Sequence, residues 1–167
     1  MSREYLYSPW RMEYILGEKP TDCVMCRANS LKDDEGNLIL YRATYCYVML
    51  NRYPYNNGHL MVVPYVHESC LSKLDKAIWQ EMNEITRICE QALRRVYQPD
   101  GVNIGMNLGE AAGAGIAEHL HLHLVPRWHG DSNFMHVVSG QRVIPEPFET
   151  SFSKLKQAIN EVVQNRA

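Results

Sequence analysis

The chain has 167 residues, a formal net charge of -2 at pH 7 and 46% hydrophobic residues, a composition typical of one globular domain. The near-zero charge argues against a broad electrostatic grip on nucleic acid, so any nucleotide partner is expected to be a small molecule held in a pocket. No apolar run approaches the ~20 residues that span a membrane, and the N-terminus lacks a signal-peptide pattern. We therefore expect a cytoplasmic protein with no membrane partner.

Residues 1–20 form an arm rich in aromatic side chains. The stretch from Pro9 is typical of a short helix, because Ser8 suits the N-cap and proline suits the first helical position. The arm could serve simple packing or a dimer contact, and the sequence pattern favours neither.

A Cys-x-x-Cys pair follows at Cys23 and Cys26. Such a pair is typical of half a zinc site or of a redox pair. A redox pair normally lies at a strand-to-helix turn, and no strand pattern precedes Cys23, so zinc is favoured if the pair is functional. Two incidental thiols remain the alternative. Zinc takes four ligands, so the remaining two would have to be histidines.

The middle of the chain alternates between strand and helix patterns. Short runs rich in β-branched and aromatic residues predict strands at Leu38–Arg42, Tyr45–Leu50 and His59–Pro64, with a loop of turn formers at 51–58. From Leu71 to Tyr97 the apolar residues recur at three- and four-residue steps, which predicts a long amphipathic helix that covers a sheet.

The C-terminal third contains two more predicted strands and a last helix. The strands are Val102–Asn107 and the histidine-rich segment 118–126, separated by a Gly/Ala loop, and the helix runs from about Phe152 to Val163. Residues 127–147 look irregular. The order of strands, helix, strands and helix lacks βαβ alternation, so we expect an α+β fold: an antiparallel sheet of about five strands, one long helix packed on it and a C-terminal helix.

Three histidines lie two residues apart in the segment His119-Leu-His121-Leu-His123-Leu. A strand has a side-chain period of two, so it would place the imidazoles on one face and the leucines on the other. Residues i and i+4 of a strand lie roughly 13 Å apart, which makes a metal ion shared by His119 and His123 difficult. The absence of a nearby carboxylate on that side further weakens a metallohydrolase interpretation.

The middle histidine, His121, is the candidate nucleophile. A neutral imidazole can attack phosphorus with one nitrogen while the other donates to a fixed acceptor, here expected to be a backbone carbonyl, to form a phosphoramidate that water or another acceptor resolves. His123 could donate to the phosphate oxygens as charge builds there. The small residues of the loop Gly109–Gly115 would let backbone amides approach an anion, although the loop is no Walker A motif.

The histidine segment reproduces the His-φ-His-φ-His-φ-φ signature of the histidine triad (HIT) family of nucleotide hydrolases and transferases. Upstream, Asn51-Arg-Tyr-Pro-Tyr-Asn-Asn-Gly-His59 resembles that family's Asn-x-x-Pro-x-x-x-Gly-His strand entry. The two motifs cover roughly residues 20–130, and 103–115 with 126–128 look most like the branch that acts on diadenosine polyphosphates. The resemblance implies a single HIT-like domain over 1–167, with the arm at 1–20, a core of about 21–130 and a C-terminal extension with a helix at 131–167.

The resemblance also implies a role for each matching residue. His121 would take up AMP from the α-phosphate of an adenine dinucleotide such as a diadenosine polyphosphate, in a hydrolase or a phosphorylase. His123 would contact the phosphate, and His119 would support it or bind metal. Asn51 would hold the ribose and His59 would lie behind the site. The phosphate oxygens would be contacted by Asn107, Gly113, Ala114 and Gly115.

Some family members hold a structural zinc ion, and the family is usually homodimeric. The zinc ligands implied here are Cys23, Cys26, His67 and His119, and the dimer would join two sheets across the long helix and the neighbouring strand. Three alternatives stay open: a nucleotide-binding sensor with little turnover, a nucleoside phosphoramidate hydrolase, and a phosphoesterase with zinc at the triad. The phosphoramidase branch usually has a serine in the loop before the triad, and residues 108–117 contain none. No role is assigned to Trp128, His129 or His136.

Overall fold

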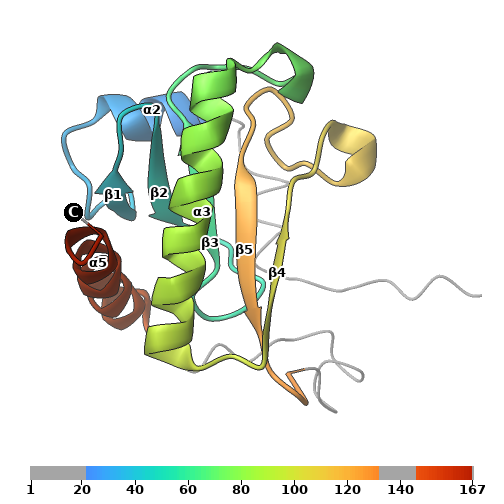
Figure 1. Ribbon diagram of the computed structural model, residues 1–167. Helices are drawn as coiled ribbons and strands as arrows, with labels where there is room; N and C mark the ends of the chain where they lie inside the picture. The colour runs from blue at the N-terminus through green and yellow to red at the C-terminus, as the bar shows by residue number, and fades with distance from the viewer. Residues whose placement is uncertain (1–21, 132–145, 167) are drawn as a thin grey trace, which may run out of the picture.

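The computed structural model describes residues 22–131 and 146–166 (Figure 1). The predicted arm with its helix from Pro9 lies outside the described residues, and so does His136. No helix in the described ranges is both long and apolar enough to cross a membrane.

Five strands form one sheet in the order β1-β2-β3-β5-β4, and every neighbouring pair is antiparallel. The strands are β1 Ile39–Arg42, β2 Cys46–Leu50, β3 Leu60–Pro64, β4 Gly101–Gly105 and β5 Leu122–Arg127. The order places β5 between β3 and β4, so the histidine segment runs beside the strand that follows the Gly-His motif. The edge of the sheet beyond β5 is β4.

Two helices cover one face of the sheet, α3 Lys76–Tyr97 and α5 Phe148–Gln164 (Figure 1). The side chain of Asp75 caps α3 by accepting the Ala77 N–H, and Gln98 ends the helix in the left-handed conformation. The apolar stripes of both helices bury against alternate strand residues in one core cluster, which includes Val48, Val62, Leu93, Leu124 and Ile159. The predicted α+β architecture is confirmed.

Several element boundaries differ from the sequence prediction. The helix pattern that starts at Leu71 is interrupted, because Leu71–Lys73 is a separate 3-10 turn (η1) and α3 begins only at Lys76. The last helix begins at Phe148, four residues earlier than predicted. A short helix, α2 at Val24–Ser30, was not predicted at all.

The prediction that one strand carries all three histidines is wrong, because β5 begins only at Leu122. The residues just before it use their polar groups elsewhere. The His119 ring bonds to the carbonyl of Pro64, and the Leu120 N–H donates to the carbonyl of Glu68. These contacts take the place of the hydrogen bonds that a longer β5 would make with its neighbouring strands.

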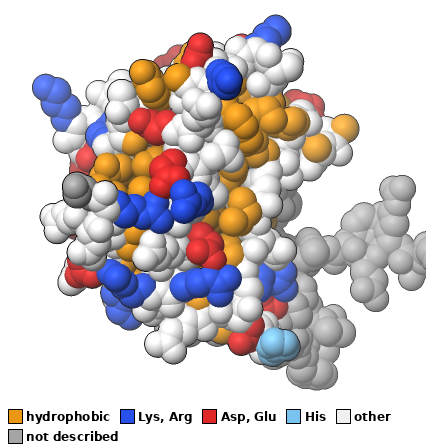
Figure 2. Space-filling view, viewed as in Figure 1, with side chains coloured by type: hydrophobic (Ala, Val, Ile, Leu, Met, Phe, Trp, Pro, Cys, Tyr) orange, Lys and Arg blue, Asp and Glu red, His pale blue; other side chains and the backbone are white. Residues whose placement is uncertain are grey.

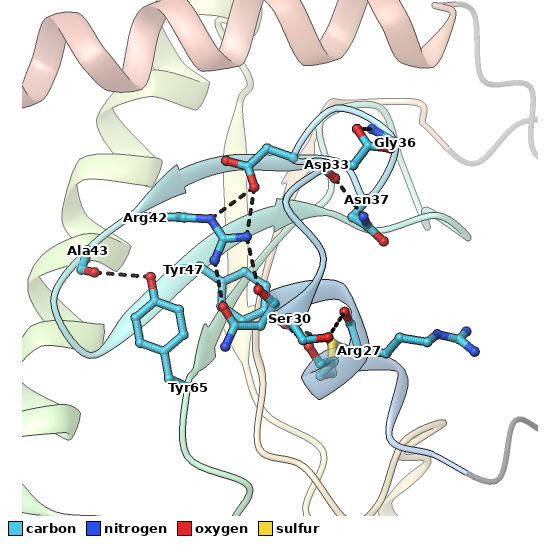
Figure 3. Close-up of polar contacts among 12 residues, drawn as sticks. Arg27, Ser30, Asp33, Gly36, Asn37, Arg42, Ala43, Tyr47 and Tyr65 are labelled. Carbon is cyan, nitrogen blue, oxygen red and sulfur yellow. Dashed lines mark hydrogen bonds and ion pairs between the residues drawn. The ribbon is translucent and has the colours of Figure 1, made fainter.

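Helix α2 packs on the sheet face that α3 leaves open. Met25 is buried against Tyr47, whose hydroxyl donates to the Met25 carbonyl at 2.9 Å. Arg42 of β1 donates to Asn29 at 2.6 Å and to Asp34 at 2.8 Å, which ties the end of α2 and the following loop to the sheet (Figure 3). This docking places the Cys-x-x-Cys pair beside the histidine segment.

Candidate active site and metal centre

The histidines lie on the sheet face opposite α3. Along β5 the side chains alternate, so Leu122 and Leu124 enter the helix-side core while His123 points to the other face. His59 precedes β3 and lies on the same side, because its Nε2 is 2.9 Å from His123 Nδ1. His121 completes the group, with its ring centroid 4.8 Å from that of His123.

The proton position on His121 is set by the main chain. Its Nδ1 lies 2.8 Å from the backbone carbonyl oxygen of His119, and a carbonyl only accepts, so Nδ1 carries the hydrogen. The other nitrogen, Nε2, then keeps its lone pair. Burial lowers the pKa of His121, whose side chain is only slightly exposed at 6%, so the ring is neutral at pH 7. A neutral imidazole with a free Nε2 lone pair is a nucleophile.

The proton position on His123 is set through His59. The backbone N–H of Tyr55 donates to His59 Nδ1 at 3.1 Å, so the proton of neutral His59 is on Nε2. That Nε2–H donates to His123 Nδ1 at 2.9 Å, which leaves the proton of His123 on its own Nε2. His121 and His123 therefore differ: one has a free lone pair at Nε2 and the other has an N–H donor there.

Burial keeps this group of imidazoles uncharged. Desolvation, followed by repulsion from His123 and His121, lowers the pKa of His59 to about 3. Desolvation and then the charge of His121 lower the pKa of His123 to about 4. The ring of Tyr55 stacks on His59 with centroids 4.9 Å apart and shields it from water.

Of the predicted substrate residues, Asn51 contacts one of these rings, and the others lie in the connection between β4 and β5. Asn51 is in direct reach, since its Nδ2 lies 3.4 Å from His59 Nδ1. Asn107 follows β4, whose last residue Gly105 is the ladder partner of His123. Gly113 has a φ of 90°, a conformation that favours glycine, and a side chain there would meet nothing within 4 Å. Ala114 and Gly115 continue the same connection toward the triad. The connection between β4 and β5 therefore starts beside His123 and has open space around Gly113.

A second cluster lies on the other side of His119. The ligand atoms of Cys23, Cys26, His67 and His119 all lie within 4.8 Å of one another. Cys23 Sγ is 3.3 Å from His119 Nδ1, and Cys26 Sγ is 3.4 Å from His67 Nδ1. In tetrahedral zinc with Zn–S of about 2.3 Å and Zn–N of about 2.0 Å, neighbouring ligands lie about 3.5 Å apart. The spacing fits such an ion.

The chemistry of these four donors fits a cation as well. His119 Nε2 lies 2.9 Å from the Pro64 carbonyl and so carries the hydrogen, which leaves the Nδ1 lone pair directed at the thiols. Burial, and then the hydrogen bond and charge of Cys23, raise the pKa of Cys26. A nearby cation would favour the deprotonated form of Cys26, which is the form that binds metal. Within the described residues His119 alone of the triad belongs to this cluster, which gives no support to zinc at His121 or His123.

Two residues near the triad in sequence lie at the far end of the β4–β5 hairpin. Trp128 packs edge-on against Tyr97 with centroids 6.3 Å apart, and His129 Nδ1 lies 2.9 Å from Asp100 Oδ2. The structure instead adds Tyr55 to the site. Nothing in the sequence pattern singles out Tyr55, because it contributes a main-chain N–H and a stacked ring.

Comparisons with known proteins point to one family. A model of the HIT domain family matches residues 33–130. An AP-4-A phosphorylase from Mycobacterium tuberculosis is 42% identical over 151 residues, which cover 84% of this chain and 76% of that protein. A bis(5'-adenosyl)-triphosphatase from Saccharomyces cerevisiae is 28% identical over 91 residues, 54% of this chain and 44% of that protein. The solved structure of a Zn-bound histidine triad family protein from Mycobacterium smegmatis superposes with a TM-score of 0.69 at 28% identity, and covers 86% of this chain and 97% of that one.

Proposed function

The chain belongs to the HIT domain family, and from that premise we propose that it is a nucleotidyl hydrolase or transferase that cleaves dinucleoside polyphosphates at the α-phosphate. The relative at 42% identity, an AP-4-A phosphorylase, supports this substrate class. The observation that carries the proposal is the 2.8 Å contact between His121 Nδ1 and the His119 carbonyl. It leaves a neutral imidazole whose Nε2 lone pair is free to attack phosphorus.

The proposed reaction has two displacements. In the first, His121 Nε2 bonds to the α-phosphorus, and the bond to the bridging oxygen breaks to release a nucleoside polyphosphate. The imidazole gains positive charge in this step. The hydrogen bond from its Nδ1–H to the His119 carbonyl stabilises that charge. In the second, water or phosphate attacks the same phosphorus and the P–N bond breaks. His123 Nε2–H donates to a non-bridging oxygen in both steps.

The loop before the triad offers no hydroxyl, imidazole or ammonium group to protonate a leaving group, which fits a leaving group that needs no proton. Residues 108–117 hold no serine, threonine, histidine or lysine, and the one carboxyl side chain there, that of Glu110, is exposed. A polyphosphate leaves as a stable anion, whereas the amine of a phosphoramidate must be protonated to leave. We therefore favour a phosphoanhydride substrate over a phosphoramidate.

We also propose that Cys23, Cys26, His67 and His119 hold a structural zinc ion. The support is the spacing of the four ligand atoms and the Zn-bound relative from M. smegmatis. A zinc ion bound there would cross-link the start of α2, the segment after β3 and His119, which lies two residues before the proposed nucleophile. It would supply structural stability and take no part in the phosphoryl transfer.

The proposed assembly is a homodimer formed at the β4 edge and the adjoining side of α3. Ile104 is 49% exposed although it points to the helix side of the sheet, and Leu108 nearby is 46% exposed. Figure 2 shows apolar side chains gathered beside α3 over β4 and β5. An edge strand next to exposed apolar residues suits pairing with a second copy.

We propose a reducing, cytoplasmic location because no disulfide links the described cysteines.

Product analysis with diadenosine tetraphosphate, with and without inorganic phosphate, tests the reaction. AMP plus ATP identifies hydrolysis, and ADP plus ATP formed only with phosphate identifies phosphorolysis. Isotopic label from the acceptor must appear on the α-phosphorus. Symmetrical cleavage to two ADP without phosphate would contradict attack at that atom, and bound nucleotide without turnover would favour the sensor alternative.

A further inference from the structure

We propose that Asn56 and Asp131 act together as positioning residues that fix the protons on His59 and His123. Neither residue is part of the triad, and neither is expected to touch the substrate. The inference rests on the function proposed above, because it concerns the same site. It is carried by the hydrogen bonds that hold the Asn56 side chain at the end of β5, and by those that the main chain at Tyr55 and Asn56 makes with His59.

Asn56 is a buried amide with both N–H groups in use. Its Nδ2 donates to the Pro126 carbonyl at 3.0 Å and to Asp131 Oδ2 at 3.0 Å, and the residue is 9% exposed. Its backbone carbonyl accepts the N–H of His59 at 3.2 Å. The side chain therefore ties the loop at 51–58 to β5 at the residue next to Tyr55.

Asp131 is the anchor for this amide. Its side chain is 8% exposed, and its carboxylate also accepts from Arg127 Nε at 2.5 Å, Arg127 Nη2 at 2.9 Å and the Trp128 N–H at 3.4 Å. A buried carboxylate held by several donors has one orientation and is a strong acceptor. Asn56 consequently has one preferred position.

That position decides where the Tyr55 peptide N–H lies, and this N–H is the nearer of two donors to His59 Nδ1, the other being the Asn51 amide at 3.4 Å. A backbone N–H only donates, so its 3.1 Å contact with His59 Nδ1 excludes a proton there. If the loop moved away, the proton could transfer to Nδ1 and Nε2 would become an acceptor. Two acceptors would then face each other across the 2.9 Å contact with His123 Nδ1.

The conflict resolves only if His123 reverses its own tautomer. Its Nε2 would then present a lone pair where the mechanism needs an N–H toward the anionic phosphate. Loss of the Asn56–Asp131 contact should therefore lower the rate of the chemical step more than it weakens substrate binding. A purely structural role would lower stability and leave the tautomers unchanged.

The same end of the hairpin offers a matched control. Asp100 accepts from the His129 N–H at 2.6 Å and pairs with the His129 ring, and neither group is linked to Asn56. Asp100→Asn makes the same chemical change as Asp131→Asn, within the same hairpin. A loss of activity in Asp131→Asn but not in Asp100→Asn would come from the position of Asn56, and not from a general weakening of this end of the hairpin.

The experiment measures the histidine tautomers by ¹⁵N NMR and steady-state kinetics with diadenosine tetraphosphate in the full chain. In the wild type, His59 and His123 should each show one tautomer with the proton on Nε2. Asn56→Ala should give a mixed or reversed His59 tautomer and lower kcat by about tenfold or more, with KM changed less than about twofold. Asp131→Asn should act in the same direction, and Asp100→Asn should change neither property.

An unchanged His59 tautomer in both test variants, an unchanged kcat, or an equal loss in Asp100→Asn would overturn the proposal. Asp131→Asn decides the matter if Asn56→Ala does not fold. If the wild type does not turn over diadenosine tetraphosphate but Asn56→Ala still shifts the His59 tautomer, the proposed function fails while the positioning role stands.

Discussion

Three imidazoles of the same intrinsic pKa do not all carry the proton on the same nitrogen, because each meets a different partner: His121 carries it on Nδ1, whereas His119 and His123 carry it on Nε2. The Pro64 carbonyl takes the Nε2–H of His119, the His119 carbonyl takes the Nδ1–H of His121, and His59 donates to Nδ1 of His123. His119 thereby directs a lone pair at the Cys23 and Cys26 thiols, His121 has a lone pair at Nε2, and His123 has an N–H donor there. The sequence supplies the three imidazoles, and their hydrogen-bond partners determine which nitrogen of each ring carries the proton.

The buried His59 predicts a loss of stability in mild acid. Its pKa is lowered to about 3 in the folded chain, against about 6.5 when unfolded, so below pH 6.5 the unfolded state binds the extra proton. Stability is thus complete above pH 6.5 and falls as the pH drops toward 3. His59 alone should cost about 2 kcal/mol between pH 6.5 and 5. Urea unfolding at both pH values should show a smaller difference in His59→Asn, and an identical difference would exclude His59 as the cause.

At the level of elements, the hydrophobic patterns predicted the five strands and the two helices of the core. A strand buries every second residue and a helix buries one stripe, so the period of the apolar residues distinguishes them. The same patterns failed where polar groups decide. β5 starts at Leu122, because the His119 ring contacts the Cys23 thiol and the Pro64 carbonyl, which no periodicity reveals. The motifs predicted the candidate residues of the site. Tyr55 and Asn56 were not predicted, because one contributes a main-chain N–H and the other a buried amide, which have no sequence signal.

One contact between elements has an effect that can be measured. Glu81 of α3 accepts the backbone N–H groups of Thr44, Tyr45 and Cys46, at 3.1, 2.6 and 3.1 Å, and so holds the β1–β2 turn on the helix. Glu81→Ala should lower the free energy of unfolding by about 1–2 kcal/mol, since three donors lose their acceptor. In the control Glu84→Ala, which removes only exposed ion pairs, the change should stay below about 1 kcal/mol. Equal losses in the two variants would contradict the assignment.

For the whole molecule, the Cys23/Cys26/His67/His119 cluster brings together segments that are far apart in the chain. The purified protein is predicted to contain about one zinc per chain. Its removal by a chelator should lower the free energy of unfolding by roughly 3 kcal/mol or more. Cys26→Ser should act alike, whereas Cys70→Ser, outside the cluster, should change little. A zinc content near zero after purification without chelators would contradict the structural role.

The exposed apolar edge makes a prediction about assembly. Light scattering should give the mass of a dimer for the wild type. Ile104→Asp should shift it toward the monomer, because a charge would be buried between the two copies. The control Leu31→Asp places the same charge at a residue 47% exposed near α2, away from β4, and should remain dimeric. A monomeric wild type would rule out the proposed interface.

His121 is the proposed nucleophile, and the covalent adduct predicted for it can be tested directly. The full chain is mixed with diadenosine tetraphosphate without phosphate, quenched at alkaline pH to preserve the P–N bond, digested and examined by mass spectrometry. Adenylate is predicted on His121, and His121→Ala should lose the adduct and at least about 10³-fold in kcat while it still binds nucleotide. Adenylate on another residue, or turnover at the normal rate in His121→Ala, would contradict the account.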